Sequence, residues 1–392
     1  MIDFYNTFTR ADLPRLFRGI VLVMAALALV FNLAICWKVY RNEPLREAYS
    51  RSLMAANSSV FYSSGLAEPV PVEALKLAMA AGADPEKALR LEGLAVFIII
   101  VALTFFVLRG RFGEVTASMA VLFLSVNPYM GYYAMQGSSH LFALAFLLLF
   151  WHYFDAPEKR RADPLLAGLY GGLACLCRVD AALVLLVIAA ISWAVKRRAF
   201  GLKEAGLALG LAFLLTLPYV LYQKAQYGSF FYAQELSLRR WANIDSYGYK
   251  PLTPAPSGPL GTAAFLLRDG PAGALGDAFR GLGRCLAYEL PRTLYYKALL
   301  VLVFLGIYAA FIFKKDRLLF FLAAALLPVL PLAAIKQVPA TGGIELRYYL
   351  WSLWALCALA ALGFHETLDW AEAGIDKWAA EKARASARSG KK

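Results

Sequence analysis

Charged side chains are scarce in this chain: Asp, Glu, Lys and Arg make up only 17% of its 392 residues, whereas 60% of the residues are hydrophobic. A soluble domain averages about 25% charged and about 45–50% apolar residues, so no globular core could absorb this excess and it must face lipid. Only three histidines and five scattered cysteines are present, which argues against a disulfide framework and a Cys/His metal site. We therefore expect an integral membrane protein with no metal and no cofactor.

The net charge of +13 could suggest a nucleic-acid partner, but the basic residues do not form one stripe. They lie in short clusters between apolar runs, where Lys and Arg orient a membrane protein by remaining in the cytoplasm. The charge pattern therefore indicates membrane lipids as a partner and no nucleic acid.

The apolar runs predict the fold class. A membrane-spanning helix needs roughly 20 apolar residues to cross a hydrocarbon core about 30 Å thick, and shorter runs can lie inside a bundle. We predict an all-α polytopic membrane protein with about ten transmembrane helices, at residues 20–40, 93–108, 115–133, 141–154, 165–177, 181–195, 205–222, 295–313, 318–335 and 348–364.

The basic clusters predict the orientation of these helices. With the N-terminus inside, every short inside loop is basic and every short outside loop has almost no Lys or Arg. This pattern predicts an inner (plasma) membrane protein with both termini in the cytoplasm. Residues 1–364 would form a single transmembrane domain with long outer loops at 41–92 and 223–293, and residues 365–392 a basic cytoplasmic tail.

Both long outer loops carry signs of order. Asp84 before Pro85 predicts a helix start, with an acceptor at the N-cap and proline at the first helical position. Residues 72–82 place apolar side chains on one face, which fits a helix lying in the membrane interface. The loop at 223–293 is rich in proline, glycine and aromatic residues, and its length and composition favour an ordered lid.

Two cations near the outer surface have two interpretations each. Ionisable groups at membrane depth are expensive, so each needs a partner. Arg178 either pairs with Asp180 within a tight turn or contacts an anionic headgroup. Arg347 starts an Arg-Tyr-Tyr segment before the last helix. In one interpretation Arg347 or Lys336 contacts a phosphate; in the other, the segment only anchors the helix in lipid.

Two further polar residues belong to the predicted substrate-binding set. Glu345 lies two residues before Arg347, a spacing that does not share a helix face, so we expect the two side chains to contact different partners. His140 opens the fourth predicted helix and either lines an outer cavity or caps that helix.

Several short motifs occur in an order that resembles a known superfamily. The chain is similar to the class C (GT-C fold) glycosyltransferases, which include the protein O-mannosyltransferases and the lipid A aminoarabinose transferase. The motifs that carry the resemblance lie at residues 68–70, 84–90, 125–128, 171–180, 218–219, 227–229 and 345–348. Each motif is degenerate by itself, and their joint order is what makes the resemblance moderately specific.

The resemblance implies a GT-C-like fold and sugar transfer, with inversion, from a polyprenyl-phosphate carrier to a lipid, glycan or protein acceptor outside the cytoplasm. It also implies a catalytic acid on the first outer loop. The usual Asp or Asp-Glu pair after the first helix is missing here, and an acid usual in the second outer loop is replaced by Gln136 and His140. We therefore predict that Glu47, ahead of Glu43 and Glu68, is the catalytic base; the alternative for each is a solvated surface acid.

Two other functions fit the same sequence. A transporter or flippase of lipid-linked sugar would need functional charges in the middle of its helices, and the sequence has few. A non-catalytic GT-C-like membrane subunit would have kept the fold after losing its acids. Substitution of the candidate acids distinguishes this second function from an active enzyme.

Overall fold

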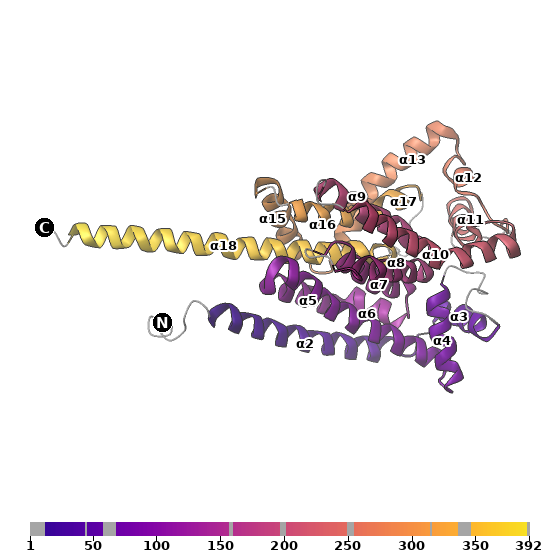
Figure 1. The fold of residues 1–392 in the computed structure, drawn as a ribbon, viewed down its shortest axis with the longest axis horizontal. Helices are drawn as coiled ribbons and strands as arrows, with labels where there is room; N and C mark the ends of the chain where they lie inside the picture. Colours follow the sequence, from indigo (N-terminus) through magenta and orange to yellow (C-terminus); the bar gives the residue numbers. More distant parts are fainter. Residues whose placement is uncertain are drawn as a thin grey trace.

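A computed structural model describes residues 12–43, 45–57, 68–156, 160–196, 201–248, 255–313, 316–335 and 346–389. Across these ranges the chain forms helices and connecting segments without a β-strand, which confirms the predicted all-α class (Figure 1). The helices are α2 (Asp12–Tyr40), α3 (Arg46–Asn57), α4 (Pro69–Ala80), α5 (Pro85–Ser125), α6 (Pro128–Met135), α7 (Ser139–Phe154), α8 (Asp163–Cys177), α9 (Ala181–Lys196), α10 (Leu202–Tyr227), α11 (Tyr232–Tyr247), α12 (Thr262–Leu266), α13 (Gly270–Arg284), α14 (Leu290–Thr293), α15 (Ala298–Phe313), α16 (Asp316–Leu326), α17 (Val329–Ala333) and α18 (Leu350–Ser389), with a π-helical turn η1 (Cys285–Glu289) and a 3₁₀ turn η2 (Leu346–Tyr349).

Several of these helices are long and apolar enough to cross a membrane. Within the described residues, four qualify alone, at Leu16–Tyr40, Pro85–Ser125, Leu202–Tyr227 and Leu346–Ile375, and two bent helix pairs raise the number to six. Shorter apolar helices lie at Asp163–Cys177, Ala181–Ala194 and Phe320–Ala333. The polytopic membrane class is thereby confirmed, whereas the number of ten spans stays a prediction.

Two local breaks shape the bundle. Gly113 interrupts α5 with φ +86°, a left-handed conformation that favours glycine. Asn127 then separates α5 from α6, and its side chain accepts a hydrogen bond from the Tyr129 amide at 3.0 Å. Asn32 of α2 donates to the backbone carbonyls of Ser125 and Asn127, both at 2.9 Å. The carbonyl groups at the helix break therefore have hydrogen-bond donors within the protein.

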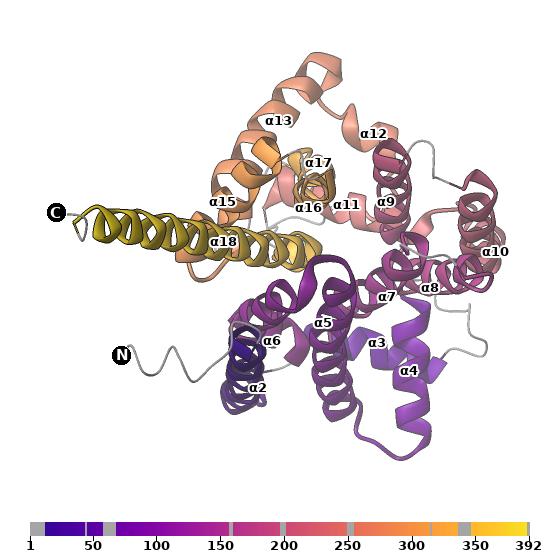
Figure 2. The ribbon, with the colours of Figure 1, turned by 60° about the vertical axis from the view of Figure 1, so that its left-hand side comes forward.

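Helix α18 is the central element of the core. It packs against α5, α15 and α16 (Figure 2). Every residue from Leu350 to Leu362 is buried. Its contact with α15 is close because glycines face each other there: a Cβ at Gly363 would lie 2.0 Å from the Leu302 carbonyl oxygen. Beyond Phe364 the same helix continues to Ser389.

Helices of the two predicted outer loops lie at the end of the molecule opposite the start of α2 and the end of α18 (Figure 1). The start of α2 and the end of α18 point to one end, and α3, α4, α11 and α12 lie at the other (Figure 1). Helix α4 covers the predicted interfacial helix, and Asp84 caps α5 as its sequence predicts, accepting from the Lys87 amide at 3.0 Å. Which end faces the cytoplasm stays a prediction.

Candidate functional site

A pocket of about 380 Å³ lies where α11 and α12 meet the ends of the bundle helices. Its walls come from α7, the turn between α8 and α9, the start of α9, α11, α12, the α16–α17 region, η2 and the start of α18. The polar lining residues are His140, Arg178, Asp180, Gln234, Ser237, Arg347 and Tyr348. Most of the other lining side chains are apolar.

The pocket runs from polar helix ends into apolar surroundings. Leu144 and Leu147 follow His140 at i+4 and i+7, so these three residues share one face of α7. Seven residues of helix span about 10 Å, which gives the apolar wall its approximate depth. The pocket therefore offers polar groups near the helix ends and apolar side chains further along the helices.

The α8–α9 turn presents a fixed arginine. Helix α8 ends at Cys177, Arg178 adopts an extended conformation, and α9 begins at Ala181. The Arg178 guanidinium donates two hydrogen bonds to Asp180, from Nε to Oδ1 at 2.9 Å and from Nη2 to Oδ2 at 3.1 Å. This bidentate pair leaves Nη1 pointing to the opposite side, where Ser139 Oγ lies 3.4 Å away.

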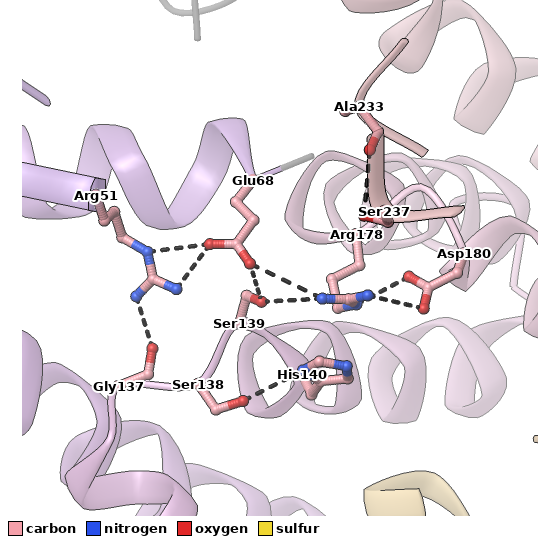
Figure 3. A network of polar contacts seen from close by, with 10 residues as sticks. All are labelled: Arg51, Glu68, Gly137, Ser138, Ser139, His140, Arg178, Asp180, Ala233 and Ser237. Atoms are coloured by element: carbon pink, nitrogen blue, oxygen red, sulfur yellow. Dashed lines mark hydrogen bonds and ion pairs between the residues drawn. The ribbon is translucent and has the colours of Figure 1, made fainter. Parts of the chain in front are cut away.

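Glu68, the N-cap residue of α4, lies next to Arg178 on the side away from Asp180 (Figure 3). Its Oε2 accepts from Arg51 Nε at 3.1 Å and Nη2 at 2.7 Å, while its Oε1 accepts from Ser139 Oγ and lies 3.8 Å from Arg178 Nη1. Burial alone would raise the pKa of Glu68, but the two guanidinium groups and the Ser139 hydroxyl outweigh it and lower that pKa. Glu68 is therefore held as an anion.

Arg51 ties the first outer segment to the bundle. Its side chain is only 1% exposed, and Nη1 donates to the Gly137 carbonyl at 2.6 Å. The Arg51–Glu68–Ser139–Arg178 chain of contacts thereby joins α3, the start of α4, the start of α7 and the α8–α9 turn (Figure 3). Four segments far apart in sequence meet at this network beside the pocket.

Aromatic rings gather around Tyr348. His140 meets the Tyr348 ring edge-on at 5.0 Å between centroids, and Trp241 of α11 lies 6.2 Å from the same ring. The guanidinium carbons of Arg178 and Arg347 lie 5.7 Å and 5.2 Å from its centroid. Both cations thus lie near one aromatic ring at the pocket, a favourable arrangement for a partly desolvated arginine.

His140 has one engaged and one unengaged ring nitrogen. Its Nδ1 lies 3.2 Å from Ser138 Oγ, and the tautomer decides which of the two donates. Its Nε2 is buried without a hydrogen-bond partner in the part of the chain that the structure describes. A buried polar atom usually has a partner, so this nitrogen keeps a free hydrogen-bonding position at the pocket.

Helices α11 and α12 cover the pocket and are fastened to its rim. Arg268, just after α12, donates to Asp245 Oδ2 at 2.6 Å, to the Ala334 carbonyl at 3.0 Å and to the Phe265 carbonyl at 2.8 Å. The Phe265 side chain and Trp241 are buried in the same apolar cluster. The segment predicted as an ordered lid thus contributes side chains directly to the pocket.

The structure brings three predicted substrate-binding residues together: Arg178, Arg347 and His140 all line the pocket. Lys336 and Glu345 fall outside the described residues. Their roles, like those of the three lining residues, stay predictions.

The predicted catalytic acids lie in three different settings. Glu68 adjoins the pocket through Arg178. The Glu43 side chain is exposed just after α2, and its carbonyl accepts from Arg90. Glu47 lies in α3, where the structure describes the backbone alone.

Sequence reasoning missed Arg51 and Ser139 and took Asp180 only as a partner of Arg178. Arg51 lies in a polar helix, and nothing in its neighbourhood signals that it is buried. Asp180 had a usable signal, because a carboxylate between two apolar runs needs a reason. Among the described residues, no group of three or more His, Cys, Asp or Glu side chains is arranged to hold a metal ion.

The comparison with protein families agrees with this picture. Residues 68–222 match the family model described as dolichyl-phosphate-mannose-protein mannosyltransferase. The matched stretch begins at Glu68 and includes His140 and Arg178, and it confirms the resemblance to class C glycosyltransferases predicted from the sequence. No curated protein matches the chain.

Proposed function

Because residues 68–222 match a mannosyltransferase family model, we propose that this membrane protein is a glycosyltransferase. It moves a sugar from a polyprenyl-phosphate carrier to a lipid, glycan or protein acceptor at the periplasmic (extracytoplasmic) face. The observation that carries the proposal is the pocket, which combines Arg178 and Arg347 with an apolar wall.

Each part of the donor has a counterpart in this pocket. The leaving phosphate needs cationic stabilisation, and the planar, permanently charged guanidinium of Arg347 suits a phosphate without requiring a metal. The apolar wall suits the first units of the isoprenoid chain. A volume of about 380 Å³ falls within the roughly 300–1,000 Å³ of small-molecule sites, so the pocket accommodates the headgroup and only the start of the lipid.

The remaining predicted residues complete the proposal. His140 offers its unengaged Nε2 to the sugar or the phosphate. Lys336 is a second cation for the phosphate, and Glu345, which does not share a helix face with Arg347, contacts a different part of the substrate. Glu47, Glu43 and Glu68 are the acids for which the sequence predicts the role of general base, and each Glu→Gln variant tests that role separately.

The covering segment supports a reaction protected from water. Trp241 and Phe265 reach the pocket from α11 and α12, at the end of the molecule opposite the start of α2. Exclusion of water would prevent hydrolysis of an activated sugar donor. The basic clusters in the other loops favour the cytoplasm for the end that carries the termini.

The test measures donor binding and transfer by purified protein in nanodiscs. The probe is radiolabelled polyprenyl-phosphate-mannose, with a panel of other polyprenyl-phosphate sugars, and a membrane fraction supplies acceptors. Arg347→Ala should lose donor affinity, and Arg347→Lys should lose part of it because a bidentate donor becomes a point charge. The matched control is Arg280→Ala, whose arginine is 81% exposed on α13. If Arg347→Ala bound and used the donor as well as Arg280→Ala, the phosphate role would be wrong.

One observation favours a second candidate, the non-catalytic GT-C-like subunit. Glu68 is engaged by two arginines and a serine, and its lowered pKa makes it a weak base. A subunit of this kind would bind the lipid-linked sugar without transferring it. Donor binding by the wild type, together with no transfer from any donor in the panel, would support this candidate.

A further inference from the structure

Asp180 has a position that no other acid near the pocket shares. Among the described residues that line the pocket, it is the only one with a carboxylate. Its side chain is 42% exposed, against 19% for Glu68, which does not line the pocket. A substrate in the pocket would therefore meet Asp180 and would be separated from Glu68 by Arg178.

The carboxylate of Asp180 is held in one orientation and can accept further hydrogen bonds. Each of its oxygens accepts one N–H of Arg178, at 2.9 and 3.1 Å, whereas a carboxylate offers about four lone-pair sites. On the side of the guanidinium away from Asp180, Arg178 Nη1 donates to Ser139 Oγ at 3.4 Å and lies 3.8 Å from Glu68 Oε1. Asp180 is thus fixed in direction and keeps acceptor capacity on each oxygen.

The carboxylate of Glu68 has no comparable capacity to accept further hydrogen bonds. Its Oε2 accepts two N–H groups from Arg51, and its Oε1 accepts from Ser139 and pairs with Arg178. All four partners come from the protein, so a substrate hydroxyl could bind only by displacing one of them. The geometry suits Glu68 for holding Arg178 rather than for contacting a substrate.

We propose that Asp180 is the carboxylate that orients the acceptor hydroxyl and takes its proton, an inference that rests on the proposed sugar transfer. The acceptor oxygen forms a bond to the anomeric carbon, and the bond from that carbon to the phosphate oxygen breaks. The electron pair of the broken bond leaves with the lipid phosphate, and the hydroxyl proton goes to Asp180. Arg178 holds the carboxylate in place, while Arg347 lies on the pocket wall for the departing phosphate.

Helix α11 places a second polar group over the same position. Ser237 lines the pocket together with Arg178 and Asp180, and all three are labelled in Figure 3. Its hydroxyl donates to the Ala233 carbonyl at 3.2 Å, which leaves the oxygen free to accept. Ser237 therefore adds an acceptor for a hydroxyl of the sugar or of the acceptor molecule next to the proposed base.

The experiment compares Asp180→Asn, Asp180→Glu and Glu68→Gln with a matched control. The control, Asp277→Asn, removes another Asp–Arg pair, the one between Asp277 and Arg280 at 2.7 Å on α13, away from the pocket. Donor binding and steady-state transfer are measured with the polyprenyl-phosphate sugars described above. The split between KM and kcat distinguishes a base from a residue that only maintains the pocket.

Asp180→Asn should lower kcat by about 10²–10⁴-fold, the usual contribution of a general base. Its donor affinity should stay the same or rise, because Arg178 loses an ion-pair partner and becomes more available to phosphate. Asp180→Glu should recover part of the rate, and Asp277→Asn should behave as the wild type. Glu68→Gln should change donor affinity more than kcat, because it acts through Arg178.

Three outcomes would overturn the proposal. Asp180→Asn with the wild-type rate would remove Asp180 from the reaction while leaving the proposed function intact. Joint loss of donor binding and transfer in that variant would mean that Asp180 only holds Arg178. A wild-type protein that transfers no sugar from any donor would overturn both the role of Asp180 and the proposed function.

Discussion

Truncation of Glu68 is the most informative perturbation of the network, because Arg51 depends on it. The Arg51 side chain is 1% exposed, and Glu68→Ala would remove its ion-pair partner, leaving the Gly137 carbonyl as an acceptor and the carboxylate of Glu92 as the neighbouring negative charge. Removal of one partner from a buried pair costs about 3–5 kcal/mol, since the remaining charge is buried without compensation. We expect a cost in this range.

The expected change in melting temperature follows from the size of the protein. An unfolding entropy of about 2.1 cal/mol/K per residue over 392 residues makes 1 kcal/mol equivalent to about 1.2 °C. Glu68→Ala should therefore lower Tm by about 4–6 °C. Tryptophan fluorescence of the purified protein in detergent, scanned against temperature, measures this shift.

Glu73→Ala is the matched control, because Glu73 lies on the same helix with a similar exposure. Its side chain is 20% exposed, and its ion pair with Lys76 is long, at 3.8 Å. Such a pair contributes about 0–1 kcal/mol, so Tm should fall by about 1 °C or less. Equal shifts for Glu68→Ala and Glu73→Ala would refute the reasoning.

The pH dependence provides a second check with a defined sign. The folded protein lowers the pKa of Glu68 below its ordinary value of 4.5, so this group stabilises the fold fully above pH 4.5. That contribution is lost as pH falls below 4.5 through the folded pKa. The difference in Tm between wild type and Glu68→Gln should be constant above pH 4.5 and shrink below it; a difference that grew on acidification would contradict the assignment.

Three other predictions concern topology, packing and catalysis. Cysteines introduced at Arg109 and Tyr247 should react with an impermeant label from opposite sides of the membrane; labelling from the same side would disprove the predicted orientation. Gly363→Ala should destabilise the protein by about 1–3 kcal/mol, because its Cβ would lie 2.0 Å from the Leu302 carbonyl, and an unchanged Tm would contradict the close α15–α18 packing. If Glu47 or Glu43 is the base, the corresponding Gln variant should lose about 10²–10⁴-fold in rate, and wild-type transfer by both would exclude them.

Local chemistry made part of the fold predictable. The Asp84–Pro85 start of α5 depends on side chains that act within a few residues of themselves, so its sequence signal survives folding. The apolar runs could be predicted because each is a continuous stretch of neighbouring residues. The kink at Gly113 falls between the predicted helices at 93–108 and 115–133, whereas its positive φ was not predicted, because a glycine in such a pattern does not by itself reveal that conformation.

The candidate site was predictable only where a charged residue lies next to an apolar, membrane-spanning run. Arg178 and Arg347 stood out as cations near apolar runs, and both line the pocket. The Arg51–Glu68 pair joins two outer-segment residues, and its burial depends on Gly137 and Ser139 from a distant turn. Because no spacing rule predicts contacts between residues so far apart in sequence, the network could be identified only from the structure.

The most direct test of the account is photo-cross-linking with a polyprenyl-phosphate that carries a photoreactive group near the phosphate. Mass spectrometry should locate the adducts on pocket residues of α7, α9 and α18, such as Leu144, Leu183 and Leu350, and excess unlabelled polyprenyl phosphate should suppress them. Adducts spread over the exposed apolar face of α2, at Val23, Leu27 and Phe31, and insensitive to competition, would contradict a lipid-phosphate site in this pocket.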